Sequence, residues 1–242
     1  MCAAAHAAAE SARAPELQAR FESAGIPEQP LELALRAYAC GSARGEITSP
    51  LLTLVDYSRP STEPRLWVLD LQKAAVRFET LVAHGRASGL QRSTSFSNVP
   101  GSKQSSLGLF RTADTYQGRH GYSLRLVGLE PGVNDRAYER AIVIHGADYA
   151  TRSFIAKHGR LGRSWGCPAL DPALHRGVID AIRGGSALFA YYPDARWLES
   201  SRYLSCTGPD PRKDDPAARH AALLTHPLHP LLDPIAALAA PR

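Results

Sequence analysis

A histidine and a cysteine in the segment Ala141–Leu170 have the types and surroundings that acyl-transfer chemistry requires. His145 follows an apolar, β-branched run at residues 142–144, and Cys167 follows Gly166 in a turn that begins and ends with glycine. A thiol reacts as its thiolate, so an imidazole that accepts the thiol proton raises the reactive fraction at neutral pH. We therefore expect Cys167 to be a nucleophile and His145 to be its base.

The turn around the cysteine offers groups that could support this chemistry. Gly166 gives the backbone room to bend and could direct its own N–H and that of Cys167 toward a developing oxyanion. Pro168 biases the residue before it away from the helical conformation, which favours a turn. We expect Ser164 to shape this turn through a hydrogen bond. Trp165 could form an apolar wall beside the thiolate or belong to the core.

This stretch resembles the catalytic motif of the L,D-transpeptidases, the YkuD-type enzymes that remodel bacterial peptidoglycan. His145-Gly146 and Ser164-Trp165-Gly166-Cys167 fill the two halves of that motif. The chain is also similar to murein L,D-transpeptidase catalytic domain proteins across residues 51–192, at Val82-Ala83-His84-Gly85, Phe96-Ser97-Asn98, Ser105-Ser106-Leu107-Gly108 and Gly121-Tyr122-Ser123-Leu124. The resemblance implies a YkuD-type β-sandwich, and it implies that the Gly146 carbonyl orients His145. This chemistry requires no cofactor and no metal.

Two features depart from the family pattern. Eighteen residues separate His145 from Ser164, slightly more than the common spacing in the family. An apolar run without arginine, residues 168–170, stands where the family places an arginine. We expect Arg163 or Arg160 to contact the substrate carboxylate instead, because a guanidinium can bind a carboxylate through two hydrogen bonds.

Three further residues are candidates for the cleft. Tyr149 and the turn at residues 105–108 could line it, by resemblance to a family segment. His84 opens a long loop at residues 84–106, and the sequence leaves open whether it contacts substrate or is structural. Asp148 is an alternative group to orient His145.

Composition limits the possible partners. The chain has 242 residues, 44% of them hydrophobic and 21% charged, as in an ordinary globular protein. The net charge of +5 favours an anionic partner, but the arginines are scattered and no nucleic-acid motif occurs. No apolar run is long enough to cross a membrane. We expect peptidoglycan stem peptides as partners, and neither nucleic acid nor a membrane span.

The four cysteines lack metal-type spacing. Cys2, Cys40, Cys167 and Cys206 form no CxxC pair, so a metal site that combines His145, His158, Cys167 and Cys206 has little support. A Cys40–Cys206 bridge is compatible with the sequence.

The chemistry predicts a periplasmic or secreted protein. Residues 1–9 lack the basic region and apolar core of a signal peptide, although Ala5-His6-Ala7 fits a cleavage site.

Patterning predicts a mainly β domain with an N-terminal packing helix and one helix after the cysteine. We expect a helical extension at 1–45, a catalytic domain at 46–203 and a proline-rich, disordered tail at 204–242. The expected strands cover residues 51–57, 65–70, 75–83, 107–112, 122–128, 141–145 and 186–192. The expected helices lie within 15–24, 30–40 and 171–183.

Together these observations predict a cysteine L,D-transpeptidase. An L,D-carboxypeptidase or crosslink hydrolase would use the same residues, with water as the acceptor. A non-catalytic peptidoglycan-binding module is the alternative from a different class.

Overall fold

Eight strands form the centre of the computed structural model, which describes residues 15–206. They are β1 (Leu51–Asp56), β2 (Leu66–Asp70), β3 (Ala75–Thr80), β4 (Gly108–Gly118), β5 (Gly121–Gly128), β6 (Val143–Gly146), β7 (Ala169–Leu170) and β8 (Ala187–Tyr191). Their order in space is β3-β2-β1-β8-β4-β5-β6-β7. The strands make one continuous hydrogen-bonded sheet because β8 pairs with both β1 and β4. The predicted mainly β, L,D-transpeptidase-type fold is confirmed.

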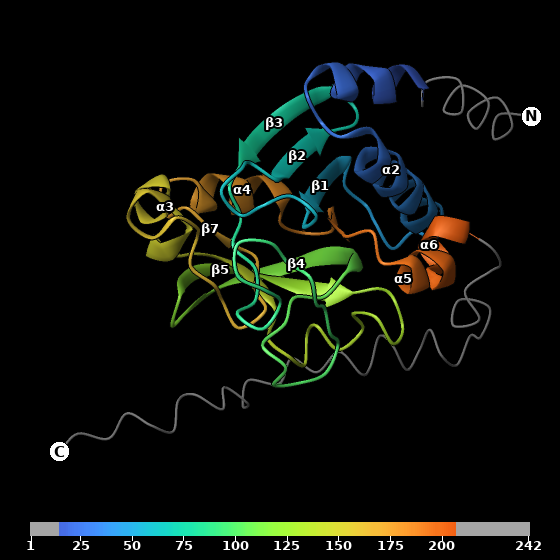
Figure 1. The fold of residues 1–242 in the computed structure, drawn as a ribbon. Coiled ribbons are helices and arrows are strands. Elements are labelled where there is room, and N and C mark those ends of the chain that lie inside the picture. The colour runs from blue at the N-terminus through green and yellow to red at the C-terminus, as the bar shows by residue number, and fades with distance from the viewer. Residues whose placement is uncertain (1–14, 207–242) are drawn as a thin grey trace, which may run out of the picture. The chain divides into compact units, whose positions relative to one another are not determined.

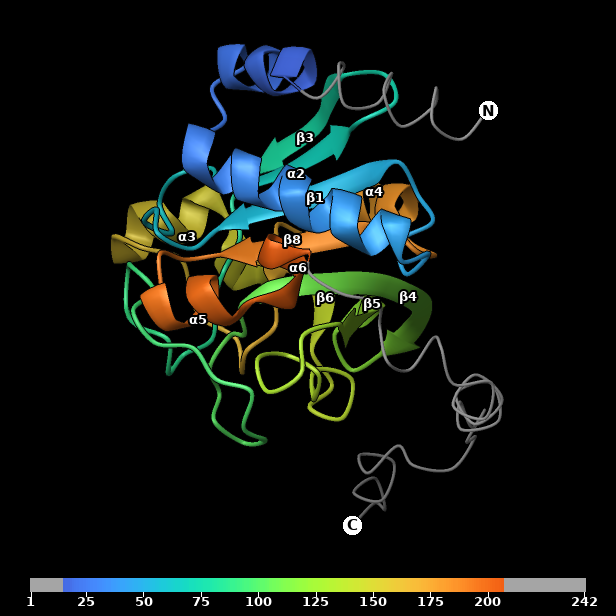
Figure 2. The same ribbon diagram turned by 90° about the vertical axis from the view of Figure 1, so that its right-hand side faces the viewer.

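Helices cover the sheet on two sides. Figures 1 and 2 show α2 (Glu28–Ala43) and α4 (His175–Ile182) on opposite sides of β1. α4 buries Val178, Ile179 and Ile182 against the sheet, as its predicted apolar stripe requires. Residues 15–23 form a first helix, also as predicted. The remaining helical segments are η1 (Asp148–Ala150), α3 (Arg152–His158), α5 (Ala195–Ser200) and α6 (Arg202–Ser205).

The N-terminal helix is part of the domain core. Leu31 and Ala34 of α2 are fully buried and share one hydrophobic cluster with the strands. The helix continues through Gly41, which was expected to lie just past its end. A side chain at Gly41 would lie 2.9 Å from Ile47 and 3.1 Å from Leu109, so the glycine serves close packing here. The segment expected as an extension therefore shares its core with the catalytic domain.

Five elements were not predicted, namely η1, α3, β7, α5 and α6. α3 buries no side chain, so its sequence lacks the apolar period that would predict a helix. Its only local signals are caps, since Thr151 accepts a hydrogen bond from the Phe154 N–H and Gly159 ends the helix at φ 71°. β7 has only two residues, too few for a strand pattern.

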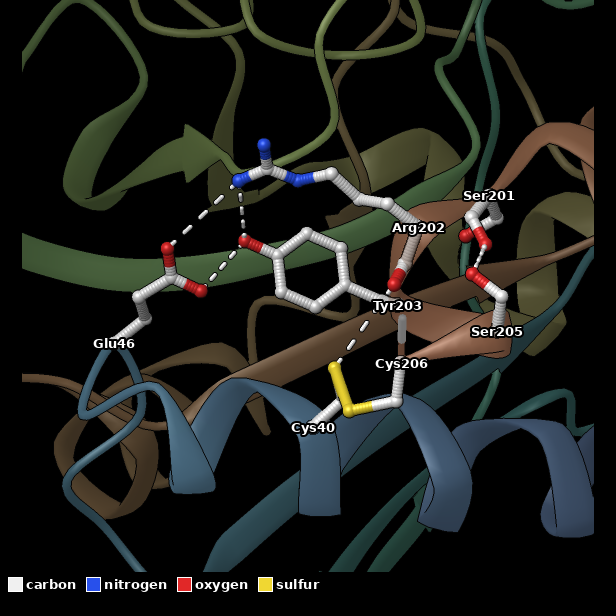
Figure 3. Close-up of a disulfide and its surroundings, with 7 residues drawn as sticks. All are labelled: Cys40, Glu46, Ser201, Arg202, Tyr203, Ser205 and Cys206. Carbon is white, nitrogen blue, oxygen red and sulfur yellow. Dashed lines mark hydrogen bonds and ion pairs between the residues drawn. A yellow bond between two sulfur atoms is a disulfide. The ribbon is translucent and has the colours of Figure 1, made fainter. Parts of the chain in front are cut away.

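A disulfide joins α2 to the C-terminal end of the described residues. Cys40 of α2 bonds to Cys206, which follows α6, with a Cα–Cα distance of 5.5 Å (Figure 3). Beside it, Tyr203 donates a hydrogen bond to Glu46 at 2.6 Å. The proline-rich tail was predicted to begin at residue 204, but Leu204 and Ser205 belong to α6 and Cys206 to the disulfide. The rest of that tail, from residue 207 onward, and the cleavage-like site at Ala5-His6-Ala7 lie outside the described residues. Within residues 15–206, no helix combines the length and apolar character that crossing a membrane demands.

The disulfide predicts a redox-dependent stability. Cys40→Ser or Cys206→Ser should lower the free energy of unfolding by about 2–4 kcal/mol, because the bridge closes a long loop in the unfolded chain. Urea titrations of the oxidised protein would measure this loss. Dithiothreitol should lower the wild-type midpoint to that of the variants and leave the variants unchanged. A wild-type midpoint that is insensitive to the reductant would contradict the bridge.

Candidate active site

A short parallel strand pair brings the two halves of the motif together. β6 and β7 align His145 opposite Ala169 and Gly146 opposite Leu170. Cys167 precedes Ala169 by two residues and lies beside the backbone of Val143. Val143 precedes His145 by two residues, so both side chains point to the same side of β6. The thiol therefore lies beside the strand that carries the histidine.

The ring of His145 is fixed by the backbone. Its Nδ1–H donates to the Gly146 carbonyl at 2.9 Å, the contact that the family resemblance implied. This bond leaves Nε2 unprotonated in the neutral ring, so Nε2 can accept a proton. The His120 ring stacks on His145 with 4.5 Å between ring centroids, and His145 is only 2% exposed.

Burial sets the protonation state of both reactive groups. It lowers the pKa of His145, and the neighbouring His120 and His175 lower that pKa further. Burial also raises the pKa of the Cys167 thiol, against the opposing effects of the Val143 N–H and the Arg140 guanidinium. Both shifts favour the uncharged forms, so the resting pair at neutral pH is a thiol and a neutral imidazole.

The thiol makes weak contacts with the backbone of the segment that leads into β6. Cys167 is half-buried, and its Sγ donates to the Ala141 carbonyl at 3.7 Å. Within residues 15–206, no hydrogen bond joins this sulfur to His145. Hydrogen bonds between catalytic groups often form only when substrate is bound, so the absence of this bond does not argue against the expected pair.

Ser164 shapes the turn before the cysteine. Its Oγ accepts from the Gly166 N–H at 3.0 Å and donates to the Cys167 carbonyl at 2.6 Å. Gly166 has φ 126°, and a Cβ there would lie 2.7 Å from the Gln104 carbonyl oxygen. Only glycine fits this position without displacement of the loop. Because the Gly166 N–H is already bonded, the Cys167 N–H is the better candidate to bind an oxyanion.

The long loop at residues 84–106 is tied to this turn. Ser105 donates to the Gly166 carbonyl at 3.1 Å and accepts from the Gly85 N–H at 3.0 Å. Arg140 donates to the Gln104 carbonyl at 2.7 Å and to Ser106 Oγ at 2.6 Å. Arg140 thus fixes the loop through hydrogen bonds. Its charge also lies close enough to Cys167 to lower the pKa of the thiol. Sequence reasoning missed Arg140, because nothing local distinguishes it from the other arginines.

The two arginines expected to bind a carboxylate are engaged elsewhere. Arg163 donates through Nη1 to the carbonyls of Arg86 and Gly89, at 2.9 and 3.0 Å. Arg160 donates to the Leu161 carbonyl at 2.8 Å. Both side chains therefore donate hydrogen bonds to backbone carbonyls. Any contact with a substrate carboxylate would have to come from their remaining N–H groups.

Trp165 and Tyr149 flank the thiol region in different ways. Trp165 is 65% exposed, with the Lys103 ammonium 5.0 Å from its ring centre, so it is not a core residue. Tyr149 is half-buried, and burial together with the nearby Cys167 raises the pKa of Tyr149 to about 12. Its phenol therefore stays protonated at neutral pH and can donate a hydrogen bond.

His84 is buried away from solvent. Its Nδ1 accepts from Arg65 Nη2 at 2.8 Å, and its Nε2 donates to the Gly89 carbonyl at 3.4 Å. Burial and the Arg65 charge lower the pKa of His84 to about 3. With both nitrogens bonded, His84 supports the loop and has no free polar atom for a substrate.

The metal hypothesis finds no support in the described part of the chain. Among residues 15–206, no three His, Cys, Asp or Glu side chains are arranged to hold a metal ion. Cys206, one of the ligands considered, is bonded to Cys40. Asp148, the alternative orienting group for His145, is exposed, and the His145 Nδ1 position is taken by Gly146.

The comparison with protein families agrees with this arrangement. The family described as the L,D-transpeptidase catalytic domain matches residues 22–191, which contain every site residue described above. The chain belongs to this family. No curated protein matches the sequence.

Solved structures with similar folds include several L,D-transpeptidases. An L,D-transpeptidase from Mycobacterium smegmatis is 12% identical, with a TM-score of 0.39, over 60% of this chain and 59% of that structure. The helical cell shape determining protein Pgp2 (K307A mutant) from Campylobacter jejuni is 14% identical, with a TM-score of 0.42, over 70% of this chain and 58% of that structure. This chain therefore spans less than two thirds of either neighbour.

The raised pKa of Cys167 predicts how the rate of thiol alkylation depends on pH. Because the pKa of Cys167 is raised, its reaction with iodoacetamide should accelerate through and beyond about pH 8.5, the ordinary pKa of a cysteine. The rates would be measured by intact mass in a Cys2→Ser background. His145→Gln should leave the profile nearly unchanged. A plateau of high reactivity between about pH 5 and 7, which an imidazolium–thiolate pair produces, would contradict the neutral pair.

Proposed function

We propose that this protein is a peptidoglycan L,D-transpeptidase that works through a thioester on Cys167. The observation that carries the proposal is the His145–Gly146 hydrogen bond at 2.9 Å on the strand beside the thiol. It leaves Nε2 of the neutral ring unprotonated and able to accept a proton. The chain's membership in the L,D-transpeptidase catalytic domain family supports the same chemistry.

The first step is acyl transfer to the thiol. His145 Nε2 accepts the Cys167 proton while Sγ attacks the carbonyl of the diamino acid at the third position of a tetrapeptide stem. The C–N bond to the terminal D-alanine breaks, and the imidazolium returns its proton to the leaving amine. The products are a thioester and free D-alanine.

The tetrahedral intermediate carries a negative oxygen that needs hydrogen-bond donors. The Cys167 N–H is one candidate, because the Gly166 N–H is already bonded to Ser164. The protonated phenol of Tyr149 is a second, since Tyr149 lies near enough to Cys167 for their charges to interact. Trp165, exposed at the same turn, would face the stem peptide.

The second step resolves the thioester. The neutral amine of a second stem attacks the thioester carbonyl, a C–N bond forms, and the C–S bond breaks. The proton lost by the amine passes through His145 to the departing thiolate, which restores the starting pair. Water in place of the amine would give an L,D-carboxypeptidase.

We also propose that the protein acts outside the cytoplasm. Its substrate is a cell-wall polymer, and disulfides persist mainly in oxidising compartments, so the Cys40–Cys206 bond favours a periplasmic or secreted location.

Acylation by a carbapenem tests the nucleophile. The strained β-lactam carbonyl should add once to the wild-type chain, and intact-mass spectrometry should detect no adduct on Cys167→Ala. His145→Gln should slow acylation by roughly 10²-fold or more, the usual contribution of a positioned base. No adduct on the folded, reduced wild type would contradict the proposal and favour a non-catalytic binding module.

Products identify the acceptor. With a tetrapeptide stem and an added D-amino acid, the exchanged stem should accumulate at the expense of the tripeptide. Tripeptide as the sole product at every amine concentration would assign the protein as a carboxypeptidase.

A further inference from the structure

The turn between β4 and β5 carries a histidine onto the candidate base. Gly118 and Gly121 pair across this turn, which leaves Arg119 and His120 at its tip. β5 then pairs with β6, the strand that carries His145. The His120 ring stacks on the His145 ring, with 4.5 Å between the centroids and 26° between the planes. The pairing of three strands therefore holds the two rings face to face.

The stack covers one face of the base and leaves the second histidine open to solvent. His145 is buried, whereas His120 is exposed. Among residues 15–206, no hydrogen bond or ion pair holds the His120 ring, so the stack is the contact that places it. His145 has a second contact, the hydrogen bond from Nδ1 to the Gly146 carbonyl. The base is thus fixed at one nitrogen by Gly146 and on one face by His120.

The His120 ring is uncharged at neutral pH. Partial burial and the neighbouring Arg119 both lower the pKa of His120. A neutral aromatic ring presents an electron-rich face, which attracts a cation that lies over it. In the proposed reaction, His145 becomes such a cation when it accepts the Cys167 proton. The stack therefore favours the imidazolium when it forms.

A proton on His120 would reverse this effect. Like charges on two stacked rings repel, and the charge of His120 lowers the pKa of His145. The other charged and titratable groups beside His120 come from its own turn, from η1 and from α4, and they are Arg119, Asp148, His175 and Arg176. Of these, His175 also lowers the pKa of His145. All four remain in place when His120 is replaced, so variants at this position report on the His120 ring itself.

We infer that His120 is a positioning residue for the base His145. Its stacked ring fixes the orientation of the His145 imidazole and stabilises the imidazolium that forms when the thiol proton is transferred. The inference rests on the proposed function and adds to it a residue outside the Cys/His motif. His120 touches no reacting atom, because the proton passes from Cys167 Sγ to His145 Nε2 and then to the leaving amine.

Two replacements separate the ring of His120 from its charge. His120→Phe keeps an aromatic face but cannot take up a proton, and His120→Ala removes the face. Carbapenem acylation of the full chain is followed by intact mass at about pH 7.5, where both imidazoles are neutral. The Phe variant should retain the wild-type rate, and the Ala variant should be roughly 3-fold to 30-fold slower, the range that a cation–π contact supports. His158→Ala should match the wild type, because His158 is also an exposed histidine in contact with an aromatic ring, that of Phe154 at 4.2 Å.

An NMR titration of the His145 ring needs no substrate and distinguishes positioning from a merely structural role. It uses the full chain carrying Cys167→Ala, with and without His120→Phe. The Phe variant should raise the pH at which His145 takes up its proton, because a phenyl ring cannot carry the opposing charge. His158→Ala should leave that pH unchanged.

The outcomes separate this inference from the proposed function. An unchanged His145 titration in His120→Phe would overturn the role of His120 even if the wild type is acylated. Equal acylation rates of the wild type and His120→Ala, or equally slow Phe and Ala variants, would overturn it as well. A raised His145 titration in the Phe variant, combined with failure of wild-type acylation, would support the effect of the stacked ring on His145 and reject the transpeptidase chemistry.

Discussion

The site depends on the parallel pairing of two very short strands, β6 and β7. The register sets His145 opposite Ala169, and Cys167, two residues before Ala169, lies beside the Val143 backbone. A slip of one residue would turn the side chains of one strand to the other side of the sheet and separate the thiol from the imidazole. A two-residue strand cannot hold such a register alone. Ala83 bonds to the other edge of β7, through its N–H to the Ala169 carbonyl at 2.9 Å, and so fixes it from both sides.

Two arginines, the buried Arg65 and the half-buried Arg140, extend this control to the loop at residues 84–106. Arg65 is fully buried and donates to the carbonyl oxygens of Val82 and Arg59 and to His84, while burial lowers the pKa of Arg65 to about 10. It therefore remains charged at neutral pH, and its bonds satisfy backbone carbonyls that water does not reach. Arg140 does the same for the far end of the loop. The loop is thus a fixed wall of the site, and its hydrogen bonds to Ser164 and Gly166 hold the cysteine turn.

The sequence predicted those features that leave a local pattern. Runs of alternating and β-branched residues predicted most strands, and the pattern of residues 171–183 predicted α4. The Cys/His pairing followed from motif spacing. Contacts between segments that are distant in the chain have no local pattern, so they were not predicted. His120 lies 25 residues before the His145 ring on which it stacks, and only the β5–β6 pairing brings the two together. The sequence left open whether His84 faces the cleft. The residues next to His84 in the chain do not reveal that Arg65, 19 residues away, bonds to its ring.

The central claim is that Cys167 and His145 rest as an uncharged pair in which the histidine is oriented for base catalysis. Long-range ¹H–¹⁵N NMR of the His145 ring tests it directly, with the assignment made by loss of the signals in His145→Gln. The account predicts a neutral ring at pH 7, protonated on Nδ1 and hydrogen-bonded to Gly146, with the same tautomer in Cys167→Ala. A doubly protonated ring that becomes neutral in Cys167→Ala would reveal an imidazolium–thiolate pair and contradict the account.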